Sequence, residues 1–144
     1  MPKNDNQTHI YKVLTEYRRI VLENDNLIKS LDYLKRLTEK SPSQYYRIDE
    51  LEKTIIPSAI EREQDAKKEI DKYIERAKSN PLFSPFSLSI IELRYFSALE
   101  WPEVAAAIFQ TTWSESTKSE KARYLNKIYK QHSRTLSVIE KALP

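Results

Sequence analysis

The 144-residue chain contains no glycine. Glycine supplies the backbone conformations that Gly-rich phosphate loops, dinucleotide fingerprints, nucleophile elbows and primed hairpin turns need. Its absence argues against many enzyme classes and against an antiparallel β-protein. Helical bundles tolerate the absence best, because Asn and Pro can end a helix. We therefore expect an all-α fold and no enzymatic activity.

The rest of the composition narrows the location and the chemistry. The chain has no cysteine, which excludes disulfides, thiolate metal sites and cysteine nucleophiles and suits a reducing cytoplasm. His9 and His132, its two histidines, lie far apart in the sequence, so we expect neither a metal nor a cofactor. No apolar run approaches the roughly 20 residues of a membrane helix, and the polar N-terminus lacks a secretion signal. These features predict a cytoplasmic protein without a membrane partner.

The N-terminal half is predicted to form two long helices. Apolar residues recur at helical spacing from about Thr8 to Lys40, and their phase continues through Asn24-Asp25-Asn26. Residues 41–46, rich in Pro and Ser, are predicted to be a linker, followed by a short helix over Asp49–Lys53. A second long helix is expected from Pro57 to Ala77. Together the two long helices predict a helical hairpin or coiled coil.

The two helices differ in apolar surface. The second offers a thin stripe, too little to cover the first. We therefore expect a homo-oligomer, a dimer or larger, held together through residues 8–40. The stripe of the first helix includes Ile10, Val13, Leu14, Tyr17, Ile20, Val21, Leu31 and Leu34.

A domain boundary is predicted at Asn80-Pro81, because Pro cannot continue a helix and the sequence changes there from charged helices with apolar stripes to a dense apolar run. Residues 1–80 would form the oligomerisation region, and residues 81–144 would fold on their own around the dense apolar run from Leu82 to Phe96. Three consecutive helices are expected in this second part. Their expected ranges are Pro85–Phe96, Trp101–Phe109 and Ser114 to at least Tyr129.

The third of these helices has the character of a DNA-recognition helix. From Ser114 to Lys121 it carries no apolar residue, whereas Leu125 and Ile128 later face a core. Between Gln110 and Arg134 six basic residues stand against two acidic ones, an excess that suits contact with phosphates. The predicted DNA-contacting residues are Ser114, Glu115, Ser116, Thr117, Lys118, Ser119, Lys121, Arg123 and Lys127.

A motif just before this helix is similar to one in a known family. Leu93-Arg94-Tyr95-Phe96, then Leu99, Trp101, Glu103-Val104-Ala105 and Ile108, resembles the L-R-Y…L-x-W-x-E-V-A-x-x-L pattern of phage late-gene regulators of the RinA and ArpU type. The resemblance covers about residues 90–130. It implies a C-terminal helix-turn-helix like region four of sigma factors, which binds promoter-proximal DNA. Trp101, Val104, Ala105 and Ile108 match its supporting helix, and Trp113-Ser114-x-x-Thr117 matches the start of its recognition helix.

Two positions depart from the family pattern. Ala98 stands where the family commonly has glycine, and the turn over residues 109–112 is about three residues longer than usual and lacks its typical glycine. These departures leave the angle and register of the recognition helix open.

The sequence therefore predicts a DNA-binding transcriptional regulator, an activator of phage or prophage late genes, with RNA polymerase as an optional further partner. One alternative is a small terminase subunit that binds packaging-site DNA, which an assembly of many subunits would favour. The other is a protein–protein adaptor or antirepressor whose degenerate helix-turn-helix no longer binds DNA.

Overall fold

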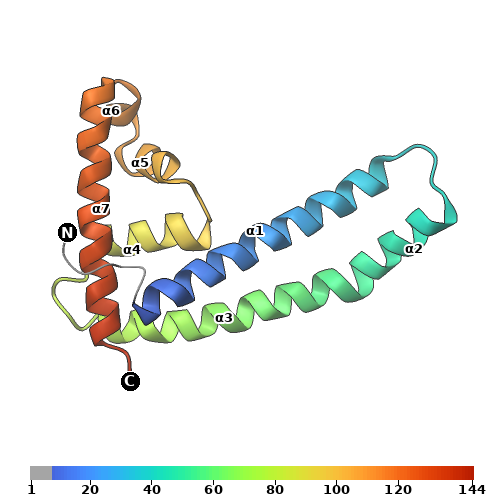
Figure 1. The fold of residues 1–144 in the computed structure, drawn as a ribbon, viewed down its shortest axis with the longest axis horizontal. Coiled ribbons are helices and arrows are strands. Elements are labelled where there is room, and N and C mark those ends of the chain that lie inside the picture. Colours follow the sequence, from blue (N-terminus) through green and yellow to red (C-terminus); the bar gives the residue numbers. More distant parts are fainter. Residues whose placement is uncertain (1–7) are drawn as a thin grey trace.

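The computed structural model describes residues 8–144, and within them only helices and their connections occur, which confirms the all-α fold. An elongated arm of two antiparallel helical rods projects from a C-terminal unit that ends in one long upright helix (Figure 1). No helix in the described range combines the length and apolarity needed to cross a membrane. The elements are α1 (His9–Arg36), α2 (Pro42–Glu50), η2 (Leu51–Ile55), α3 (Ile56–Ala77), α4 (Pro85–Ile91), η3 (Glu92–Phe96), α5 (Trp101–Phe109), α6 (Thr111–Ser114) and α7 (Lys118–Lys141).

Helix α1 runs unbroken through the Asn-Asp-Asn segment, so the prediction of one continuous helix is confirmed. Thr8 caps its start by accepting a hydrogen bond from the Tyr11 amide at 3.2 Å. Asn24 is buried, and its side-chain amide donates to the Ala59 carbonyl at 2.9 Å and to Glu63 at 3.2 Å. A residue with poor helix propensity is thus kept in α1 because its side chain bonds to α3.

The second rod of the arm is one helix from α2 through η2 to α3, and the linker predicted over residues 41–46 is wrong. Pro42 occupies the first turn, where proline is tolerated, and Ser41 and Gln44 form a capping box. Further along, Pro57 follows the π-helical turn η2, in which the Ile56 amide bonds to the Leu51 carbonyl. A π turn is wider than an α turn, so it accommodates a proline that lacks an N–H and would otherwise clash with the preceding turn.

One hydrophobic cluster, here called the shared core, joins the arm to the C-terminal unit. The turn between α3 and α4 lies at the predicted boundary near Asn80-Pro81, but the shared core has members on both sides of it. These members are Ile10, Leu14 and Tyr17 of α1, Ile70, Ile74 and Ala77 of α3, Ile91 of α4, Tyr95 of η3, and Leu136, Val138 and Ile139 of α7.

The shared core divides the arm into two parts. The arm base (residues 9–21 and 61–77) contributes to it, whereas the arm tip (residues 22–60) extends beyond it (Figure 1). The apolar stripe of α1 is therefore covered at the base within a single chain, by α3 with η3 and α7, and the inference that it lacks cover is wrong. Toward the tip, Leu31 and Leu34 are only half-buried, where α2 and η2 pack beside α1.

A polar joint also holds α1 against the turn after η3. Arg18 donates to the carbonyls of Ala98 and Leu99, at 3.2 and 3.4 Å, and pairs with Glu100 at 3.1 Å. Arg94 donates to the same Leu99 carbonyl at 3.0 Å. Burial lowers the pKa of Arg94, and the nearby Arg18 charge adds to the effect. The joint fixes the direction in which the arm leaves the C-terminal unit.

Candidate nucleic-acid interface

The C-terminal unit packs α4, η3, α5 and α7 around a smaller cluster. Ile90, Val104, Ala105 and Ile128 are fully buried there, and Trp101 and Ile108 pack against them. The Trp101 ring meets Tyr129 and His132 edge-on, with centroid distances of 5.4 and 4.8 Å. Trp101 thus anchors the start of α5 against the middle of α7.

The connection between α5 and α7 differs from the prediction that the third helix begins near Ser114. The short helix α6 occupies Thr111–Ser114, and α7 starts only at Lys118. Gln110 ends α5 with φ 51° and ψ −123°, a conformation that favours glycine. Thr117 then caps α7 in a capping box with Glu120. The predicted start is wrong because the residues between Gln110 and Thr117 form a separate turn of helix.

Several predicted contact residues in this connection serve its own structure. Ser114 Oγ donates to the Thr111 carbonyl at 3.0 Å, and Ser116 Oγ donates to the Thr112 carbonyl. Thr117 Oγ1 accepts from the Glu120 amide at 3.2 Å. Glu115 lies exposed in the same stretch.

The lysines and the arginine predicted to act together do not share one face of α7. At 3.6 residues per turn, Lys121 and Arg123 point about 160° apart. By helical spacing Lys118 shares the side of Lys121, whose ammonium sits over the Trp113 ring of α6, 5.2 Å from its centroid. Arg123, Lys127 and Ser119 lie on the opposite, outer side of the helix. The predicted contact set is therefore split into two groups.

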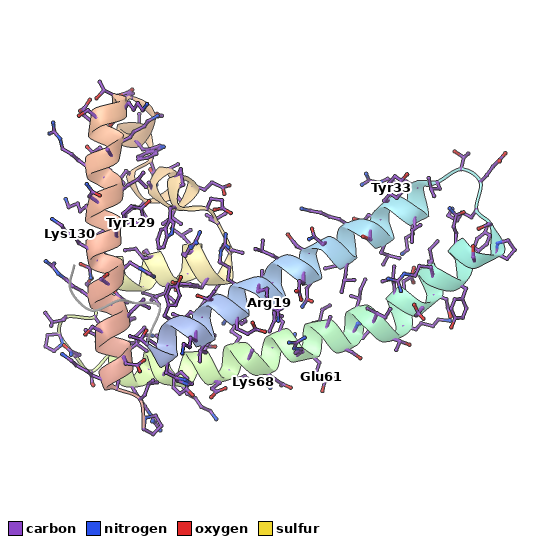
Figure 2. All side chains as sticks on the ribbon, viewed as in Figure 1. Arg19, Tyr33, Glu61, Lys68, Tyr129 and Lys130 are labelled. Atoms are coloured by element: carbon purple, nitrogen blue, oxygen red, sulfur yellow. The ribbon has the colours of Figure 1, made fainter. Side chains whose placement is uncertain are left out.

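The outer side of α7 carries a continuous row of cations, here called the α7 basic stripe. Its members follow one another at intervals of four, three, four and seven residues, which places them within roughly 60° of the helix surface over about 27 Å. Figure 2 shows Lys130 on the side of α7 away from the other helices, whereas Tyr129 turns toward α5. Within residues 8–144, none of the cations of the α7 basic stripe has a carboxylate within 4 Å. The stripe consists of Arg123, Lys127, Lys130, Arg134 and Lys141, all exposed.

The acidic residues of α7 leave the stripe positive. Glu140 is turned toward α1, where its carboxylate accepts from the backbone amides of His9 and Ile10 at 3.2 and 2.8 Å. Glu120 lies at the edge of the stripe. The hydrogen bond from the Thr117 amide lowers the pKa of Glu120, and Arg123 lowers it further. Glu140 thus caps α1 instead of neutralising the stripe.

Three members of the stripe were not among the predicted contact residues. Lys130, Arg134 and Lys141 share the face of Arg123 and Lys127, and their spacing is visible in the sequence once the helix is extended to residue 141. Asn126 and Ser119 add exposed, uncharged polar groups beside the cations.

Within residues 8–144, no group of three or more His, Asp or Glu side chains could hold a metal ion. Comparison with protein-family models, with curated proteins and with solved structures found no match to this chain. The geometry of α7 and the motif before it are therefore the observations from which a function is inferred.

Proposed function

We propose that this protein binds double-stranded DNA through the α7 basic stripe and acts as a sequence-specific transcriptional regulator. The observation that carries the proposal is the alignment of five exposed, unpaired cations on the one face of α7 that packs against nothing else in the described chain. Such a row releases counterions from a phosphate backbone, which drives association with DNA. It also fixes the orientation of the helix on the duplex.

The dimensions and chemistry of the outer face favour a duplex groove. An α-helix is about 10–12 Å wide with its side chains, and the major groove of B-DNA is about 12 Å wide. Asn126 and Ser119 lie between or beside the cations, so they would face base edges while Arg123 and Lys127 contact phosphates. An Asn side chain pairs with adenine through two hydrogen bonds. Asn126 is thus the stripe's best candidate for reading sequence.

The regulatory role rests on the likeness of residues 93–108 to the late-gene regulators. In this interpretation α5 is the supporting helix, with Val104 and Ala105 in the core. The longer connection over residues 110–117 moves Glu115 and Ser116 off the recognition helix. We therefore propose that contact with DNA runs along the length of α7 and is not limited to its first turns.

The test compares two triple variants with the same loss of charge. Lys127→Ala/Lys130→Ala/Arg134→Ala removes two lysines and one arginine from the stripe, and Lys68→Ala/Lys72→Ala/Arg76→Ala removes the same types from the exposed side of α3. For the stripe variant we expect the slope of log affinity against log salt to fall by about 0.9 for each phosphate that the variant no longer neutralises. Equal slopes for both variants would show that α7 is not the interface.

Sequence specificity is tested separately by selecting binding sites from random duplex DNA. We expect the wild type to enrich one sequence and the Asn126→Ala variant to enrich that sequence less. The affinity of the variant for duplex DNA of unrelated sequence, which depends on phosphate contacts, should stay the same. A promoter fusion carrying the selected site then measures regulation. If the wild type binds no duplex, and the stripe variant melts as the wild type does, a protein–protein adaptor would be favoured.

A further inference from the structure

The arm tip presents a second charged face, and its signs alternate. Asp25, Lys29, Asp32 and Arg36 follow one another in α1 at intervals of four, three and four residues. This spacing places all four within roughly 60° of one side of the helix. All four side chains are exposed. The C-terminal unit covers this side of α1 from Tyr11 to Arg18, and within residues 8–144 the face beyond Arg18 is open.

Within residues 8–144, the four charges form no ion pair. Other charged neighbours along the arm close ion pairs: Arg19 with Glu23, and Lys53 with Asp49 at 2.6 Å. Asp25, Lys29, Asp32 and Arg36 have the same i,i+3 and i,i+4 spacing, but in the described part of the chain none of them lies within 4 Å of an opposite charge. Their charges therefore remain available to a partner.

The order of signs is self-complementary under a two-fold axis. If an antiparallel copy of α1 is placed with the axis between Ser30 and Leu31, Asp25 of each copy faces Arg36 of the other. Lys29 then faces Asp32, and symmetry generates four ion pairs. A shift by one helical turn in either direction brings Asp25 opposite Asp32, or Lys29 opposite Arg36. The pattern thus specifies both the orientation and the register of the pairing.

Apolar side chains flank this face and lack cover. Leu22 is 39% exposed and Tyr33 is 65% exposed, and both lie along one edge of the charged row. Figure 2 shows Tyr33 on the side of α1 that faces away from α3. The two-fold axis would place the Tyr33 residues of both copies on the same edge, about 8 Å apart along the helix axis. Buried Tyr is a preferred interface residue, so the edges would contribute apolar contact beside the ion pairs.

We propose that the outer face of the α1 tip is a two-fold interface with a second copy of this chain. It differs from the apolar stripe from which oligomerisation was predicted, because Leu31 and Leu34 of that stripe turn toward the second rod of the arm. The partner's arm would extend past the tip, away from the C-terminal unit. Each dimer would then carry one α7 basic stripe at each of its far ends.

The test exchanges charges on this face and measures mass by sedimentation equilibrium. Asp25→Lys/Asp32→Lys makes the row entirely positive, and Lys29→Asp/Arg36→Asp makes it entirely negative. Wild type is expected to reach twice the 17.0 kDa chain mass. Each double variant should weaken self-association at least about tenfold, because like charges now face each other. An equimolar mixture of the two should associate again, as a heterodimer.

Two controls separate the interface from a general charge effect. Glu61→Lys/Asp65→Lys makes the same charge change on exposed α3 positions and should leave the dimer intact. The quadruple variant that exchanges all four signs restores a complementary pattern and should dimerise like the wild type. A wild type that stays monomeric at about 100 µM, where interfaces of useful affinity are populated, would overturn the proposal. So would double variants that associate like the wild type, or a mixture that stays monomeric.

Discussion

The base and the tip of the arm are made from the same two antiparallel rods, yet they are buried differently. At the base, Ile10, Leu14 and Ile70 are fully enclosed, because η3 and α7 cover the rods from outside. At the tip the rods have only each other, and Leu51 is the one fully buried hydrophobic residue among residues 22–60. Two helices alone cannot enclose a core, so the tip keeps exposed apolar groups such as Tyr33 and Tyr46. The base is therefore expected to carry stability, and the tip is free to serve association.

The largest effect is expected when the base is separated from the C-terminal unit. A fragment of residues 81–144 keeps the smaller cluster of α4, α5 and α7 but exposes Ile91, Tyr95 and Leu136, whose partners lie on α1 and α3. The sequence boundary predicts that this fragment folds on its own, whereas the shared core predicts that it loses a cooperative thermal transition. Circular dichroism of the fragment decides between them. A sharp helical melt would show that the shared core is dispensable.

The same substitution at the two ends of α1 should differ in cost. Leu14→Ala empties a fully buried position, and we expect a loss of about 3–5 kcal/mol in the free energy of unfolding. Leu31→Ala acts at a half-buried position, so we expect about 1 kcal/mol. Urea unfolding of both variants measures the difference. Equal losses would mean that the tip is packed as tightly as the base.

Neighbouring arginines test whether the polar joint at the base matters. Arg18→Ala removes the side-chain donor to the Ala98 carbonyl and leaves the Leu99 carbonyl with Arg94 alone, and we expect a loss of about 1–3 kcal/mol in unfolding free energy. Arg19→Ala removes exposed pairs with Glu16 and Glu23 and should leave the midpoint nearly unchanged. Urea unfolding compares the two variants. If the polar joint contributes nothing to stability, the two variants will have the same urea midpoint.

The smallest effect concerns a strained turn outside the arm. Gln110 holds φ 51° and ψ −123°, so Gln110→Gly should relieve strain and raise the free energy of unfolding by about 1 kcal/mol. Amide hydrogen exchange can show which parts of the molecule become more stable in this variant. Amides of the arm base should gain protection because they open with the whole molecule, and amides of the tip should not, because they open locally. A uniform gain would argue that base and tip unfold together.

Much of the fold was accessible from local patterns in the sequence. The unbroken α1, the end of α3 at Ala77 and the limits of α5 follow from apolar spacing, from Asn80-Pro81 and from Pro102 in the first turn. Within residues 8–144 the backbone takes positive φ at Ala98 and Gln110, two places where this glycine-free sequence departs from the pattern that it resembles. The start of α7 was misplaced because Thr117 and Ser114 are both good caps, and local preference does not choose between them.

The site was predicted only in part, for a related reason. Sequence proximity grouped Lys118, Lys121 and Arg123, although the turn of the helix separates them. The cations that do share a face extend to Lys141 and emerge once the full length of α7 is known. Which face of α7 is free was decided by α4 and α5, which pack on the other side.

The sequence by itself determined that this chain is helical, where most of its helices begin and end, and that residues 110–134 carry an excess of basic side chains. These properties depend on residues a few positions apart, so they can be recognised locally. Tertiary structure alone decided that the arm base and the C-terminal unit share one core. It also decided that the α7 basic stripe and the charged row on the α1 tip remain exposed. Those outcomes depend on contacts between residues such as Ile10 and Ile139, which are distant in the chain and meet only when the helices pack.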